Sequence, residues 1–232
     1  MNNDSYYSNA PVIELDQISR GQFISRTYNH LFGAIIAFTL FEVFLFKSGL
    51  ADGMARAMMG TSWLLVLGGF VLISWVARVA AHRATSMPAQ YAALAGYVIG
   101  EAIIFVPLLY VANHYAPGAI ASAALVTLVG FTGLSAIVFI TRKDFSFLRG
   151  ILMWGGIIAM VLIVAGVIFG FQLGTFFSVA MVALAGGAIL YDTDNILRNY
   201  PSDRYVAASL ELFADVALML WYVLRLFLSS RR

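Results

Sequence analysis

Residues 150–191 read GILMWGGIIAMVLIVAGVIFGFQLGTFFSVAMVALAGGAILY, and this stretch decides the fold class. It contains no Asp, Glu, Lys or Arg. A helix needs about 20 apolar residues to cross the hydrocarbon core of a bilayer, so the stretch is long enough for two crossings. The segment Phe171-Gln172-Leu173-Gly174 must then form a tight turn at one membrane face. The sequence therefore predicts two membrane-spanning helices joined by a short turn.

The composition of the whole chain agrees with this reading. Of the 232 residues, 61% are hydrophobic and 11% are charged, which is less than half of the roughly 25% charge typical of soluble proteins. The mean hydropathy of +0.86 excludes a soluble globular domain and a disordered chain. Nucleic-acid binding is excluded as well, because the adjacent basic pairs are Arg142-Lys143 and Arg231-Arg232 and no basic patch exists. With no cysteine, disulfides and thiolate metal sites are impossible.

The remaining apolar runs extend the pattern to seven segments. We predict an all-α polytopic membrane protein with seven transmembrane helices, in which residues 1–27 are a polar tail and residues 28–232 form the membrane domain. The expected spans are residues 29–47, 59–79, 89–112, 119–140, 150–170, 174–192 and 208–228.

The basic residues set the expected orientation, because Lys and Arg favour cytoplasmic loops. With a cytoplasmic N-terminus, the outer loops before the last span hold only Lys47 and Arg56. The inner segments then hold Arg20, Arg26, Arg78, Arg83, Arg142, Lys143, Arg149, Arg198 and Arg204. Arg225, Arg231 and Arg232 oppose this orientation if the last segment crosses fully. We favour full crossing over re-entry, because residues 208–228 are long enough to span.

Six ionisable side chains fall within or at the ends of these segments: Glu42, Arg78, Glu101, Asp192, Glu211 and Asp215. Inside a bilayer such groups need a partner or a water-filled cavity. Arg78 and Asp192 end the second and sixth segments at the cytoplasmic face, and Asp215 lies about 10 Å deep in the seventh. We expect these three side chains to meet if their helices are neighbours.

Two carboxylates and one guanidinium at similar depth indicate a proton-sensitive cluster. Carboxylates held close together titrate as a coupled pair, and Arg78 would compensate one of them. Glu211 precedes Asp215 by four residues and shares its helix face, so it would stand at the mouth of the same cavity. Glu101, in the middle of the third segment, is a second candidate for an ion path. Glu42 is expected near the outer face beside Lys47.

Asp192 and Asp215 could also hold calcium weakly in transit, since calcium takes six to eight oxygen ligands. His30, His82 and His114 lie at segment ends, too scattered for a metal site. Gly133-Leu134-Ser135 lacks a partnered base, so neither an enzymatic site nor a resident cofactor is expected.

Three motifs carry a resemblance to a known family: Thr141-Arg142-Lys143-Asp144-Phe145-Ser146-Phe147, Leu190-Tyr191-Asp192-Thr193 and Leu212-Phe213-Ala214-Asp215. In this order they resemble the Bax inhibitor-1 family, also called the transmembrane Bax inhibitor motif family, in its compact bacterial form. The match is closest over roughly residues 130–232. Leu218 departs from the family pattern, in which a polar residue often follows the aspartate by three positions.

The resemblance implies a last helix at the centre of the other six, in a bacterial plasma membrane. It also implies a pH-sensitive calcium leak with Asp192 and Asp215 as the sensing pair and Arg78 as the latch of the closed state. The lipid bilayer, calcium and protons are then the expected partners.

Two other functions remain open from the sequence. The chain could be a non-transporting regulator that binds a membrane protease or a survival-pathway partner, or it could be a proton-coupled cation transporter that uses the same acidic residues. Three results would distinguish these functions. Calcium flux without an imposed proton gradient would indicate the leak, and co-purification of a partner would indicate the regulator. Uphill calcium movement on a proton gradient would indicate the transporter.

Overall fold

The structure is a computed structural model that describes residues 11–83 and 86–230. Seven of its helices are long and apolar enough to cross a membrane, which confirms the predicted fold class. The elements in chain order are the 3-10 helix η1 (Val12–Glu14) and the α-helices α2 (Gln17–Lys47), α3 (Leu50–Met59), α4 (Trp63–Arg83), α5 (Met87–Tyr115), α6 (Ala119–Thr141), α7 (Leu148–Phe169), α8 (Thr175–Arg198) and α9 (Tyr205–Ser229).

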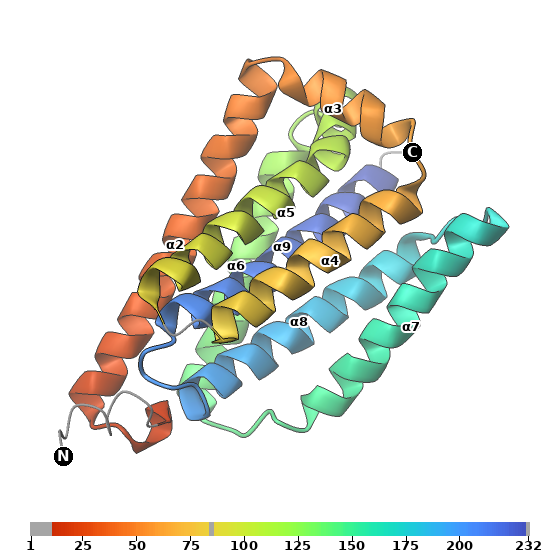
Figure 1. The fold of residues 1–232 in the computed structure, drawn as a ribbon. Coiled ribbons are helices and arrows are strands. Elements are labelled where there is room, and N and C mark those ends of the chain that lie inside the picture. Colours follow the sequence, from red (N-terminus) through yellow and green to blue (C-terminus); the bar gives the residue numbers. More distant parts are fainter. Residues whose placement is uncertain (1–10, 84–85, 231–232) are drawn as a thin grey trace.

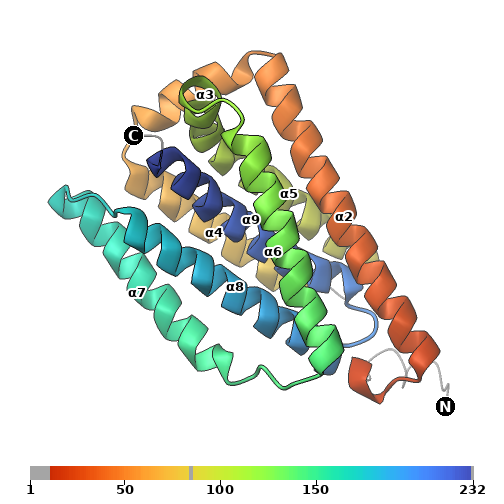
Figure 2. The ribbon, with the colours of Figure 1, turned by 180° about the vertical axis from the view of Figure 1, so that it is seen from behind.

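Helix α9 lies at the centre of the bundle, as expected (Figure 1). It packs against α2, α4, α5, α6 and α8, and its buried residues run from Val206 to Leu224. Small residues such as Ala207 and Ala214 allow the surrounding helices to approach closely. Helix α7 lies outside this ring, where it packs against α8 and α4 (Figure 2). The centre of the fold is therefore enclosed by five spans, and the sixth lies against their outer side.

The first helix begins earlier than the sequence indicates. Asp16 caps α2, because its Oδ1 accepts the Ser19 backbone N–H at 2.8 Å and its Oδ2 accepts the Ser19 hydroxyl at 3.0 Å. These hydrogen bonds hold the pKa of Asp16 below its usual range. Residues 17–27, which we assigned to the polar tail, form the first turns of α2 instead. Residues 1–10 of that tail lie outside the described residues, as do Arg231 and Arg232.

The short helix α3 was not predicted, because a ten-residue segment with Asp52 and Arg56 is too short to cross the bilayer and lies in an expected outer loop. It follows Gly49, whose φ of 77° reverses the chain, and it packs against α2, α4 and α5. Near this end of α2, Glu42 is buried rather than paired at the surface, and neither of its carboxyl oxygens has a hydrogen-bond partner among the described residues. The expectation that Glu42 pairs near Lys47 is therefore wrong.

The predicted turn between the paired helices is confirmed. Helix α7 ends at Phe169 and is followed by Gly170, with φ 73°, and α8 begins at Thr175. Arg225 of α9 donates from Nη2 to the carbonyl of Leu173 in this turn at 2.9 Å. Helix α9 has 25 residues, or about 37 Å at 1.5 Å per residue, so it runs the length of the bundle and does not re-enter.

At the opposite end, Asp194 holds the loop between α6 and α7. Its Oδ2 accepts the backbone N–H of Phe145 at 2.9 Å, and its Oδ1 accepts Arg198 Nε at 2.6 Å. Arg198 in turn donates from Nη2 to the carbonyl of Arg142 at 3.1 Å. The Asp194 side chain is 5% exposed and the Arg198 side chain is 30% exposed, so the pair lies partly buried at this end of the bundle. They join the Thr141–Phe147 motif to the end of α8, directly after the Leu190–Thr193 motif.

We expect Asp194→Ala to lower the free energy of unfolding by about 2 kcal/mol, because hydrogen bonds to a charged group contribute about 1.5–3 kcal/mol each. Thermal unfolding of the purified protein in detergent micelles measures the loss as a lower Tm. Asp203→Ala is the matched control, since its side chain is 38% exposed and lies 3.5 Å from Arg204; exposed pairs contribute about 0–1 kcal/mol. Equal Tm shifts in the two variants would contradict a locking role for Asp194.

Candidate functional site

Asp215, in the middle of α9, forms the core of the candidate site. It is 5% exposed and lies beside Asp192, near the end of α8, close enough for the two carboxyl groups to interact. A hydrogen bond between two carboxyl groups needs a proton on one of them, because an ionised carboxylate can only accept. One oxygen of Asp215, Oδ2, is buried without a hydrogen-bond partner in the described residues. The structure thus brings together the two aspartates that the sequence singled out.

Arg78 of α4 is paired with Glu211 rather than directly with an aspartate. Its Nη1 lies 2.8 Å from Glu211 Oε2, while Asp215 is near enough for a weaker charge interaction. The Arg78 side chain is 43% exposed, but it faces an internal cavity. Glu211 is buried on the same face of α9 as Asp215, one turn earlier. Glu211 is therefore the direct partner of the guanidinium and not a solvated group at the cavity mouth.

Glu101 of α5 joins the same group of side chains through Tyr97. The Tyr97 side chain lies beside both Arg78 and Glu101, close enough to interact with each, and both α5 residues are buried. The ring of Tyr97 packs edge-on against Phe213 of α9, with centroids 6.1 Å apart. This provides the partner for Glu101 that the sequence left unidentified.

Tyr200, in the loop between α8 and α9, covers the group from one end of the bundle. It is buried beside Glu211 and Asp192, and burial together with these carboxylates raises its pKa far above the usual value. Its carbonyl accepts the backbone N–H of Val12 at 2.9 Å, and Val12 is completely buried. The segment before α2 therefore closes this end over the ionisable groups. We refer to Arg78, Tyr97, Glu101, Asp192, Tyr200, Glu211 and Asp215 together as the polar cluster.

A large cavity reaches the polar cluster from the other end of the bundle. Its volume is about 1610 Å³, and it lies between α4, α5, α7, α8 and α9. It begins at the turn that holds Leu173, beside Arg225, and ends at Arg78, Glu101 and Asp215. Helix α7 leaves room for it, because α7 lies outside the ring of helices around α9. The turn lines one end of the cavity and the polar cluster lines the other, and Tyr200 covers the far side of the cluster.

Two carboxyl groups from α8 and α9 lie side by side in this arrangement. Two negative charges so close together would repel each other, so the protonation of the pair would affect how the two helices pack. Around the pair stand Arg78 from α4, Tyr97 and Glu101 from α5, and Tyr200 and Glu211. Arg78 is the one basic side chain within the cluster as described, so its pairing is sensitive to the charge of every carboxyl around it.

The polar cluster does not form a preformed metal centre. In the described residues, no group of three or more His, Cys, Asp or Glu side chains lies close enough to hold a metal ion. His30 and His114 hydrogen-bond to backbone carbonyls of their own helices, and the side chain of His82 lies outside the described residues. Two aspartates alone offer a cation few of the oxygen ligands that calcium takes.

Two members of the cluster escaped the sequence analysis. Tyr97 lies four residues before Glu101, and this spacing on one helix face was a usable signal. Tyr200 lies in a loop, where no helical periodicity applies, so nothing in its surroundings along the chain pointed to it.

Comparison with known proteins gives a family match over most of the chain. The model of the family described as "Inhibitor of apoptosis-promoting Bax1" matches residues 20–232. This range includes all seven residues of the polar cluster.

Individual relatives are more distant. "Bax inhibitor 1" of Schizosaccharomyces pombe is 28% identical over 91% of this chain and 78% of its own length. "Modulator of FtsH protease YccA" of Escherichia coli is 28% identical over 66% of this chain and 68% of its own length. An uncharacterized protein of Campylobacter jejuni is 29% identical over 88% of each chain.

Proposed function

This chain belongs to the Bax inhibitor-1 family, and from that premise we propose that it is a pH-sensitive calcium leak gated by the Asp192–Asp215 pair. It is a multi-pass membrane protein. The observation that carries the proposal is the close approach of two carboxyl groups on neighbouring helices, at the inner end of a large cavity. A proton can be gained or lost there with a direct effect on how α8 and α9 pack.

The closed state in this proposal is the arrangement described above. Arg78 is the latch, because its pairing with Glu211 holds α4 against α9. The cavity supplies the route for the cation up to Asp215 and Glu101. When a proton leaves the pair, the negative charge at the end of the cavity rises, which attracts a divalent cation and draws Arg78 away from Glu211. The cation is cargo and binds only in transit.

The proposal includes a cytoplasmic N-terminus and a bacterial plasma membrane. The distribution of Lys and Arg supports this orientation. An Escherichia coli relative carries the name "Inner membrane protein YccA", which supports the location. Tyr200 and Val12 then close the cytoplasmic side, and the cavity opens outward.

Calcium flux from proteoliposomes tests this function. The purified protein is reconstituted with a calcium indicator inside the vesicles, and entry is followed at a series of pH values with no proton gradient. Passive entry that changes with pH is the expected result. Absence of flux at every pH would contradict the leak, and uphill calcium movement on an imposed proton gradient would indicate a coupled transporter instead.

A second function is supported by the Escherichia coli relative named as a modulator of the FtsH protease. We expect a membrane regulator of this kind to restore the half-life of a short-lived FtsH substrate in Escherichia coli cells that lack YccA. Pulse-chase labelling measures the half-life. Asp215→Asn separates the two functions, since it should leave protease modulation unchanged if the cluster serves only the leak. Failure of the wild-type chain to alter the half-life would remove this second function.

A further inference from the structure

A groove of about 490 Å³ separates α2 from α5 on the outer surface of the bundle, on the other side of α5 from the polar cluster. Its walls are apolar, and small residues make room for it: Gly33 and Ala37 on α2 face Ala95 on α5. A Cβ atom added at Gly33 would meet no other atom within 4 Å. The volume falls in the range of small-ligand sites, which is about 300–1,000 Å³.

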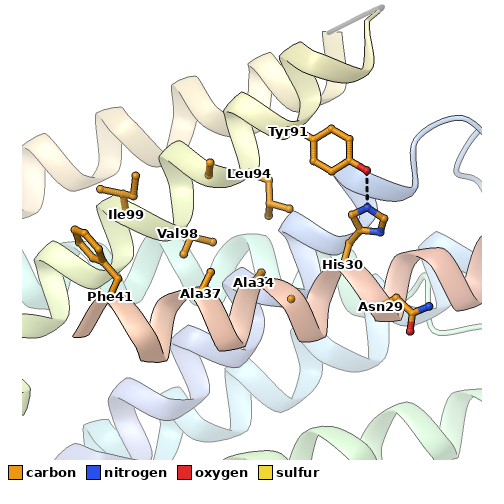
Figure 3. Close-up of a pocket in the computed structure, with 11 residues that line it drawn as sticks. Asn29, His30, Ala34, Ala37, Phe41, Tyr91, Leu94, Val98 and Ile99 are labelled. Carbon is orange, nitrogen blue, oxygen red and sulfur yellow. Dashed lines mark hydrogen bonds between the residues drawn. The ribbon is translucent and has the colours of Figure 1, made fainter. Parts of the chain in front are cut away.

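One end of the groove is apolar and the other is polar, as Figure 3 shows. Phe41 and Ile99 lie at the apolar end, and His30, Asn29 and Tyr91 lie at the polar end. An elongated molecule that enters the groove at its polar end would therefore lie along α2, with its other end toward the middle of the membrane.

The polar end is built from interlocked side chains. His30 Nδ1 lies 2.7 Å from the carbonyl of Arg26, which can only accept, so Nδ1 carries the proton. In the neutral ring, Nε2 then accepts the Tyr91 hydroxyl at 2.7 Å. The ring of Tyr205 packs against that of His30 with centroids 5.1 Å apart. These three contacts therefore fix the orientation of the His30 ring, which lines the polar end of the groove.

The positive charge of Arg26 lies near the polar end of the groove, against the Tyr205 ring that packs on His30. The guanidinium carbon of Arg26 lies 5.5 Å from the centre of the Tyr205 ring. Arg26 is exposed, and its guanidinium lies over the face of the Tyr205 ring. No described residue that lines the groove is acidic. An anion at this end would meet a cation, an amide from Asn29 and aromatic edges, with no negative charge from the lining to repel it.

We propose that the groove binds one acyl chain of an anionic glycerophospholipid, whose phosphate is held by Arg26 and Asn29. The apolar channel suits a hydrocarbon chain, and the polar end lies where α2 approaches the membrane surface. Basic pockets between transmembrane helices at the cytoplasmic face suit anionic headgroups. A neutral lipid would fill the same channel without the charge contribution.

Native mass spectrometry of the full-length protein tests the site. Delipidated protein in detergent is equilibrated with equal amounts of phosphatidylglycerol and phosphatidylcholine that carry the same acyl chains. The wild-type protein should retain one phosphatidylglycerol in preference. Arg26→Gln should weaken its retention about fivefold, as expected for one basic residue near a membrane surface, and Gly33→Leu should abolish it by filling the channel.

The matched controls are Arg149→Gln, at an exposed arginine of α7, and Gly133→Leu, at an exposed glycine of α6 with equally open surroundings. Both should retain the lipid as the wild type does. Gly33→Leu should fold normally, because leucine favours a helix more than glycine does, and gel filtration with circular dichroism checks this.

Three results would overturn the proposal. Equal retention of both lipids, unchanged in Gly33→Leu, would mean that ordinary boundary lipid covers the groove. Loss of retention in Arg26→Gln with full retention in Gly33→Leu would place the lipid outside the channel. A protein dimer that Gly33→Leu converts to a monomer would mean that a second copy of the chain occupies the groove.

Discussion

Asp215→Asn is expected to remove the pH dependence of calcium flux through reconstituted protein. An asparagine amide donates a hydrogen bond to the Asp192 carboxylate without a shared proton, so the contact between α8 and α9 holds at every pH. A switch that binds one proton changes the ratio of its two states by up to about tenfold per pH unit. The wild-type flux should therefore vary strongly across its transition. The Asp215→Asn flux should stay flat, with a change below about twofold over the same range.

Asp192→Asn should have the same effect, because the pair acts as one titrating unit. Asp52→Asn serves as the control, since Asp52 is an exposed residue of α3 far along the chain from the cluster. It should retain the wild-type profile. A normal pH profile in both Asp192→Asn and Asp215→Asn would exclude the pair as the sensor, even if the protein conducts calcium.

Arg78→Gln is expected both to destabilise the protein and to raise the leak at all pH values. The change leaves the buried Glu211 without its ion-pair partner. Removing one member of a fully buried pair costs about 3–5 kcal/mol. Because the Arg78 side chain is 43% exposed to the cavity, screening should reduce the loss to about 2 kcal/mol. Equilibrium unfolding in mixed micelles and the liposome flux assay measure the two effects.

Glu211→Gln in the Arg78→Gln background should recover part of the lost stability, since a neutral amide then replaces the carboxylate that lost its ion pair with Arg78. A double-mutant cycle over the two sites isolates the coupling between them. We expect a coupling energy of at least about 1 kcal/mol. Additive effects, within about 0.5 kcal/mol, would show that Arg78 and Glu211 do not stabilise each other and would remove the latch.

The site itself could be predicted only in part. The positions of Arg78, Asp192 and Asp215 along their spans predicted that the three side chains lie at a similar depth in the membrane. The structure places all three in the polar cluster. Depth does not show how each helix is rotated about its own axis, however. Arg78 was therefore expected to compensate an aspartate, whereas its partner at 2.8 Å is Glu211. The role of Tyr97 depends on the same missing angle, since it is the orientation of α5 that turns Tyr97 and Glu101 toward α4.

The amino-acid sequence by itself determined the number of spans, the turn at residues 171–174 and the levels of the buried charges. In a bilayer each helix must satisfy its backbone hydrogen bonds internally, so a span is a local property that composition and length reveal. Tertiary structure alone decided that α7 lies outside the ring, that α3 packs across α2 and α5, that Glu42 is buried, and which partner each charge has. A helix that is apolar on all sides has no hydrophobic face to show which neighbour it packs against. Those contacts are set by packing among many helices, and they leave no periodic pattern in any one of them.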